Sequence, residues 1–248
     1  MMRRALWLTR HEFGQRVWML ALLLALTGGI EGLLFQATLM PLDPFYPIRF
    51  EAVVDRCGIP AVFVLALGAL VAMDVLGFLQ GFMSSKSIYA LLTLPLDRRW
   101  VYLSKLASSW LTALFLWCFQ LLLILAFHGA YAAKFAETLP RASLYLGFLR
   151  SNFLHTLFPP HPIAAAAALA AIFTLVALLQ VIIINLKTGR FLKLSLAALA
   201  CVYPASKLFP LLEHAPEAGL LKLLIALLLV VGCADLGARA FERQGVSA

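Results

Sequence analysis

The main pattern in the sequence is a series of apolar blocks, each about 20 residues long, separated by shorter polar stretches. A helix needs about 20 apolar residues to cross the roughly 30 Å hydrocarbon core of a bilayer. Each block therefore predicts one membrane-spanning helix. The predicted fold is an all-α, polytopic membrane protein with one domain over residues 1–248. Its six predicted spans are residues 17–39, 57–82, 105–127, 163–186, 194–212 and 219–236.

Composition supports a lipid environment for most of these side chains. The chain is 63% hydrophobic and 13% charged, whereas a soluble domain is roughly half apolar and a quarter charged. The net charge of +8 would suggest nucleic acid in a soluble protein, but here it indicates cationic membrane loops. We therefore expect membrane lipid, and no nucleic acid, as a partner.

The distribution of Lys and Arg predicts the orientation of the chain in the cell membrane. With six spans both termini share one side, and that side holds 13 of the 20 Lys and Arg residues. The more cationic side is the cytoplasmic one. Both termini and the loops at 83–104 and 187–193 are thus expected in the cytoplasm. The segments at 40–56, 128–162 and 213–218 are expected outside.

The two longer outer segments differ in composition. Residues 40–56 are rich in Pro and aromatic side chains, which is typical of an irregular cap at headgroup level. Residues 128–162 carry more apolar side chains than an ordinary loop, and we expect a short interfacial helix there that ends near Pro159 and Pro160.

The cytoplasmic stretch between spans two and three is the most informative part of the sequence. Serines precede an apolar run with helical spacing, and Pro95 ends it. Asp97 can then cap a helix that runs into span three. The short helix either anchors the loop at the membrane surface or fits the groove of a cytoplasmic partner. The residues expected to contact such a partner are Ser87, Ile88, Tyr89, Leu91, Leu92, Leu94, Pro95, Arg98 and Arg99.

This stretch resembles the first cytoplasmic loop of type-2 ABC exporter permeases. In that family a short helix is followed by Leu-x-x-Leu-Pro, a polar residue with Arg, and a Lys that opens the third span. Here 91–95, Arg98, Arg99 and Lys105 match in order. The six-span layout, the inward termini and the charged tail are also similar. One departure is the outer loop between the last two spans, which is short here although many family members carry re-entrant helices there.

The resemblance implies a transmembrane subunit of an ATP-driven exporter. The chain would pair with a second permease chain, identical or homologous, and with two copies of a separate ATPase subunit. The segment Ser87–Leu94 would be the coupling helix. ATP and Mg would bind to the ATPase, so this chain would be neither an enzyme nor the holder of a cofactor. In agreement, the nearest string to a P-loop, Gly81 to Ser87, has Ser where the second Gly belongs.

Two acids lie inside predicted spans, Glu31 in span one and Asp74 in span two. A charge at the centre of a membrane helix costs about 2.5–3.5 kcal/mol. Such a residue therefore faces other helices as a structural acid, or it lines a path for a cationic or polar substrate. The candidate path residues are Glu31, Gln36, Asp74 and Gln80. Gln120 and Gln180 are more typical of hydrogen bonds between helices, and Asp235 is expected to pair with Arg239 one turn on.

Small residues at helical spacing predict close helix contacts, either within the chain or across a dimer seam in span one. The candidates are Gly28, Gly32, Gly77 and Gly81. The histidines and cysteines show no metal-ligand spacing, so no metal site is expected.

Two other functions fit the membrane layout. One is a non-transporting assembly or immunity subunit with the same fold. The other is an intramembrane enzyme that acts on lipid or peptide, although the sequence has no HExxH motif, no Gly-x-Ser-x-Gly motif and no paired carboxylates on an inner helix face.

Overall fold

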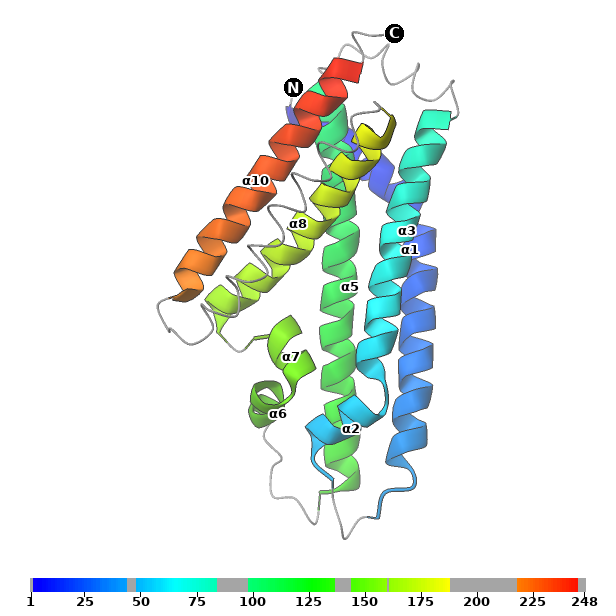
Figure 1. Cartoon of the computed structure of the whole chain (residues 1–248). Coiled ribbons are helices and arrows are strands. Elements are labelled where there is room, and N and C mark those ends of the chain that lie inside the picture. Colours follow the sequence, from blue (N-terminus) through cyan, green and yellow to red (C-terminus); the bar gives the residue numbers. More distant parts are fainter. Residues whose placement is uncertain are drawn as a thin grey trace. The chain divides into compact units, whose positions relative to one another are not determined.

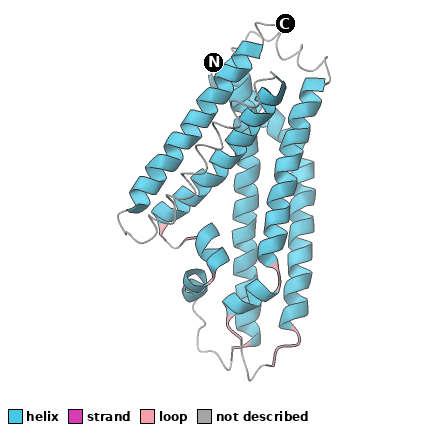
Figure 2. Cartoon of the chain, in the orientation of Figure 1, coloured by secondary structure: helices cyan, strands magenta, loops and turns pink. Residues whose placement is uncertain are grey.

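The computed structural model describes residues 2–43, 48–83, 98–136, 144–159, 161–187 and 218–244. Within these ranges the chain is helical and contains no strand, as Figure 2 shows. The all-α fold class is thus confirmed for the described residues. The helices, labelled in Figure 1, are α1 (Met2–Leu39), α2 (Phe50–Arg56), α3 (Ile59–Met83), α5 (Arg98–Lys134), α6 (Leu144–Arg150), α7 (Asn152–Leu157), α8 (Pro162–Lys187) and α10 (Ala218–Gln244).

Four of the helices are long and apolar enough to cross a bilayer. The qualifying segments are Leu6–Leu39, Ile59–Gly77, Arg99–Lys134 and Pro162–Ile182. They coincide with the first four predicted spans and identify a multi-pass helical membrane protein. The predicted fifth span, 194–212, lies outside the described residues, and α10 covers the sixth. The total of six spans therefore stays a prediction.

Several helices are longer than the apolar blocks that predicted them. Helix α1 begins at Met2 instead of near residue 17, and α5 runs from Arg98 to Lys134 instead of from 105 to 127. An apolar block marks only the part of a helix that lipid surrounds. The helix itself continues until a breaker such as proline stops it, and neither extension contains one. The start of α5 confirms the predicted helix that runs through Arg98 and Arg99 into span three.

The two longer segments predicted to lie outside are also more helical than expected. Residues 40–56 were expected to be irregular throughout, which is wrong for their second half, where α2 spans Phe50–Arg56. The three prolines of this segment all precede α2, so its residues are free to bury Phe50, Val53 and Val54. Gly58, with φ of +73°, then turns the chain into α3. The short helix predicted before Pro159 is confirmed by α7, whose N-cap residue Ser151 accepts a hydrogen bond from the Leu154 amide.

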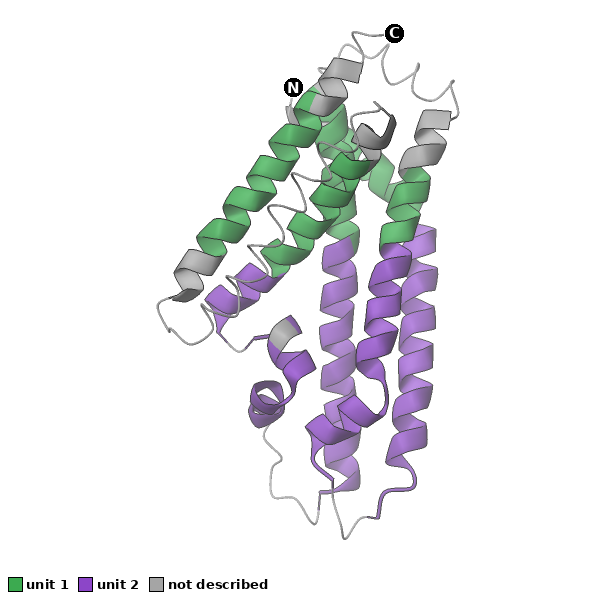
Figure 3. Cartoon of the chain, viewed as in Figure 1, with its two compact units in different colours: residues 1–16, 71–112, 169–248 green, residues 17–70, 113–168 purple. Residues whose placement is uncertain are grey.

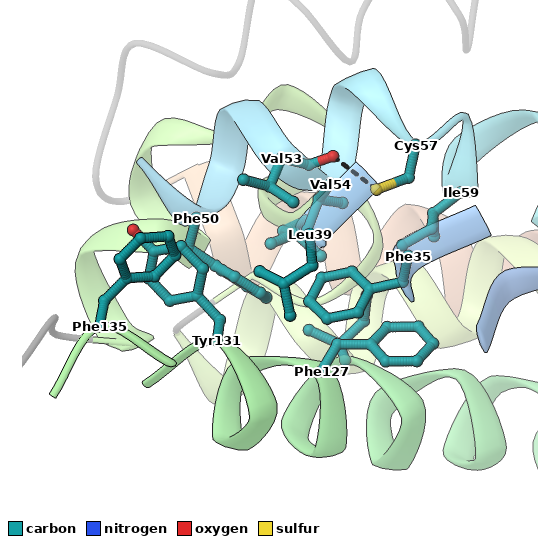
Figure 4. Packing of buried hydrophobic residues seen from close by; sticks show 12 residues of the cluster. Phe35, Leu39, Phe50, Val53, Val54, Cys57, Ile59, Phe127, Tyr131 and Phe135 are labelled. Carbon is teal, nitrogen blue, oxygen red and sulfur yellow. Dashed lines mark hydrogen bonds between the residues drawn. The ribbon is translucent and has the colours of Figure 1, made fainter. Parts of the chain in front are cut away.

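The chain divides into two compact units, coloured separately in Figure 3. Unit 1 comprises residues 1–16, 71–112 and 169–248, and unit 2 comprises residues 17–70 and 113–168. Unit 2 contains the larger hydrophobic core, drawn in Figure 4, where Phe35 of α1 stacks on Phe127 of α5 with ring centroids 4.6 Å apart. The Tyr131 hydroxyl donates to the Ile48 carbonyl at 2.6 Å and so fixes the chain before α2.

Unit 1 has its own core, centred on the fully buried Tyr102 of α5. Leu8 of α1, Ala177 of α8 and Ala238 of α10 pack in the same cluster. Gly237 passes so close to the Tyr102 ring that an added Cβ would overlap the hydroxyl oxygen. The glycine is therefore required by this contact and not by its backbone conformation.

Candidate functional site: a polar cluster on four helices

Unit 1 holds a group of polar side chains that connects four of the long helices. We call it the polar cluster. Its members are Glu12 and Arg16 of α1, Asp74 of α3, Lys105 and Ser109 of α5, and Gln180 of α8.

Arg16 is the centre of the cluster on α1. Its Nη1 atom forms an ion pair with Asp74 Oδ1, and the two side chains are only 16% and 10% exposed. The same nitrogen donates to Ser109 Oγ at 2.9 Å. One guanidinium thus joins α1 to both α3 and α5.

Ser109 receives a second hydrogen bond from the neighbouring α8. Gln180 Nε2 donates to Ser109 Oγ at 2.8 Å, and the serine hydroxyl donates to the Lys105 carbonyl one turn earlier at 3.1 Å. The Lys105 side chain reaches back to α1, where its Nζ donates to Glu12 Oε1 at 2.9 Å. Ser109 is fully buried, so this hydroxyl is a junction between three helices.

The charges of the cluster cancel in two pairs, Arg16 with Asp74 and Lys105 with Glu12. A charge withdrawn from water is tolerated only when it is paired and hydrogen-bonded. The ion pair with Arg16 therefore explains how the structure tolerates an acid at Asp74. Bonds of this kind hold helices in one arrangement and can be exchanged for others when the helices move.

Two helices of the cluster, α3 and α5, end and begin in the sequence on either side of residues 84–97, which include the segment that resembles a coupling helix. Along α3, Asp74 is about 14 Å from Met83, where α3 ends. Along α5, Lys105 is about 10 Å from Arg98, where α5 begins. The residues between these two helix ends are 84–97.

A second buried polar contact lies in unit 2, between α1 and α5. Glu31 is fully buried, and its Oε2 accepts a hydrogen bond from Gln120 Nε2 at 2.8 Å. The two helices are close at this level, because a Cβ added to Gly28 would lie 3.0 Å from the Phe119 ring.

The other residues singled out from the sequence are distributed as follows. Gln36 is exposed on α1, and α3 contains Gln80 and Gly81, whose side-chain surroundings lie outside the described residues. Residues Ser87 to Pro95, and with them the predicted coupling helix, also lie outside. Arg98 is the first residue of α5 and Arg99 is exposed.

Only some of the predicted contacts appear where they were expected. Gly28 packs closely inside the chain, whereas Gly32 and Gly77 have open space where a Cβ would lie. Gln120 and Gln180 form the predicted hydrogen bonds between helices. The Asp235–Arg239 pair is confirmed at 2.7 Å.

The sequence did not assign Glu12, Arg16, Lys105 and Ser109 to any cluster. Arg16 entered the sequence argument only as a loop charge that sets the orientation, and Lys105 entered it as such a charge and as the Lys that opens the third span in the resemblance. The available signal was charge balance, since a buried Asp74 needs a cation and Arg16 and Lys105 stand at the ends of spans one and three. In the described part of the chain no three His, Cys, Asp or Glu side chains converge as metal ligands would.

Comparison of the chain with protein-family models, with curated proteins and with solved structures gave no match.

Proposed function

We propose that the chain is the membrane-spanning subunit of an ATP-driven exporter of the ABC type. In this proposal it acts as a dimer, with itself or with a homologous chain, and a separate ATPase subunit drives it from the cytoplasm. The observation that carries the proposal is the 84–97 segment, whose Leu91–Leu92–Thr93–Leu94–Pro95 string resembles the coupling loop of such permeases. It connects two helices that each run unbroken across a bilayer's thickness.

The polar cluster supports this mechanism. A motor that moved residues 84–97 would act directly on α3 and α5, the helices on either side. Arg16 ties both of these helices to α1, and Ser109 ties α5 to α8. The motion would thus be shared by four helices, as alternating access to a substrate path requires.

The test places a charge on the face proposed to dock the ATPase. Leu91→Asp and Leu92→Asp are each expected to abolish co-purification of the ATPase while the chain still inserts in the membrane, because an uncompensated carboxylate in an apolar groove is strongly unfavourable. The matched control is Thr93→Asp, which adds the same charge at a polar position of the same segment. The measurement is the amount of ATPase recovered per permease from detergent-solubilised membranes, together with the ATPase activity of the complex.

Two results would contradict the proposal. One is assembly of an intact, substrate-stimulated complex by both leucine variants, which would remove the coupling role from this segment. The other is a topology reporter at residues 84–97 that is found outside the cell.

A further inference from the structure

The contact between Glu31 and Gln120 is incomplete in a specific way. One hydrogen bond is made, from the amide nitrogen of Gln120 to Oε2 of Glu31. The second oxygen of each side chain, Oε1 in both residues, is buried and has no hydrogen-bond partner in the described chain. Both atoms are acceptors when the carboxyl is ionised. The contact between Glu31 and Gln120 therefore lacks a hydrogen-bond donor for these two oxygens.

The surroundings of Glu31 do not stabilise a negative charge. Within the described residues the ion pairs of the membrane helices involve other acids, and none includes Glu31. The side chain is fully buried and receives a single hydrogen bond from a neutral amide. An isolated carboxylate removed from water is so unfavourable that such a group normally neutralises.

We propose that Glu31 is a proton-binding site, in which the protonated carboxyl of α1 and the amide of Gln120 on α5 form a neutral acid–amide pair. A proton on Oε1 of Glu31 turns that atom into a donor, and Oε1 of Gln120 is the acceptor still open on the side chain already bound to the same carboxyl. One proton, taken from water when the two helices come together, therefore satisfies both open atoms.

The geometry favours a proton over a metal cation. Hard cations such as Mg²⁺ and Ca²⁺ take six or more oxygen ligands, and this site offers two open oxygens. The neighbouring Thr27 hydroxyl donates to the Leu23 carbonyl of its own helix. The close packing of Gly28 on Phe119 adds a tight apolar contact one turn away. Glu31 in this state is closed to a cationic cargo and fastens α1 to α5, whether or not an ATPase binds the chain.

The test is infrared spectroscopy of the full-length protein in lipid nanodiscs, compared between the wild type and Glu31→Gln. The wild type is expected to show a carbonyl stretch of a protonated carboxylic acid at neutral pH, and the variant is expected to lose that band with no loss of carboxylate intensity. A loss of carboxylate bands instead would overturn the proposal, because it would mean that Glu31 is ionised, with water or a cation at the open oxygens.

Stability provides an independent readout. Glu31→Gln replaces the acid by an amide that can still donate to Gln120 and accept from it, so its unfolding equilibrium constant is expected to stay within about threefold of the wild type. Glu31→Ala leaves the Gln120 amide without partners and is expected to raise that constant roughly tenfold or more. Gln36→Ala, at an exposed position of the same helix, is the control and is expected to be near neutral. A Glu31→Gln chain that fails to fold would also overturn the proposal.

Discussion

The ion pair between Arg16 and Asp74 allows a direct test of whether the polar cluster holds the helices of unit 1 together. The perturbation is Asp74→Ala, which removes the carboxylate and leaves the Arg16 guanidinium with its bond to Ser109. The control is Asp235→Ala in α10. It breaks an ion pair of the same chemistry, but there the acid and base are 47% and 62% exposed instead of 10% and 16%.

Burial sets the expected magnitudes. Removing one partner of a buried pair typically costs about 3–5 kcal/mol, because the remaining charge is left without compensation. The bond that Arg16 keeps to Ser109 places Asp74→Ala at the lower end of that range. Exposed pairs contribute about 0.2–1 kcal/mol. The two variants should therefore differ by about 2 kcal/mol or more in free energy of unfolding, which is roughly thirtyfold in the equilibrium constant.

The assay is reversible unfolding in mixed micelles titrated with sodium dodecyl sulfate and followed by the fluorescence of the five tryptophans. A third variant, Arg16→Leu combined with Asp74→Ala, removes both charges and is expected to recover part of the loss. If Asp74→Ala proves no more destabilising than Asp235→Ala, the polar cluster does not hold these helices and its part in the proposed mechanism fails.

Two further predictions concern close packing and thiol reactivity. Gly237→Ala should destabilise the protein by about 1–3 kcal/mol in the same assay, because its Cβ would overlap the Tyr102 hydroxyl, whereas Gly232→Ala on the same helix has open space and should be neutral or slightly stabilising. A destabilised Gly232→Ala would instead indicate a general intolerance of α10. Cys57 is buried, its thiol donates to the Val53 carbonyl at 2.8 Å, and burial raises the pKa of that thiol. Because burial blocks access and the raised pKa leaves less thiolate at pH 7–8, maleimide labelling of Cys57 should be slower in the folded protein than in the detergent-unfolded chain. Equal rates would contradict its burial.

The sequence predicted the first four membrane helices well because a single local property, apolar length, determines them. The ends of α1 and α5 were harder to predict, since the helices extend past the apolar blocks into polar sequence. Helix α2 was missed because the prolines before it dominated the composition of its segment. Each of these errors arises because the prediction used composition, which does not show where backbone hydrogen bonding continues a helix.

The polar contacts could not be predicted from the local sequence pattern. The cost of burying a charge singled out Asp74 and Glu31, but it could not name their partners. Arg16 and Asp74 are 58 residues apart in the sequence, and Glu31 and Gln120 are 89 residues apart. Which helices are neighbours is a property of the packed bundle, and helical periodicity carries no information on it. For the same reason Gly28 could not be told from Gly32 or Gly77.

The chain order of these contacts has a consequence for biogenesis. Helix α1 leaves the ribosome before the other described helices, while Gln120 of α5 is still to be synthesised. Arg16, in contrast, finds Asp74 as soon as α3 follows, and Gln180 of α8 is the last of the described partners to arrive. Until α5 enters the membrane, Glu31 on α1 lacks the Gln120 amide that donates to it in the folded chain. We therefore expect a nascent chain that stops after α3 to hold α1 in the membrane less firmly than one that includes α5.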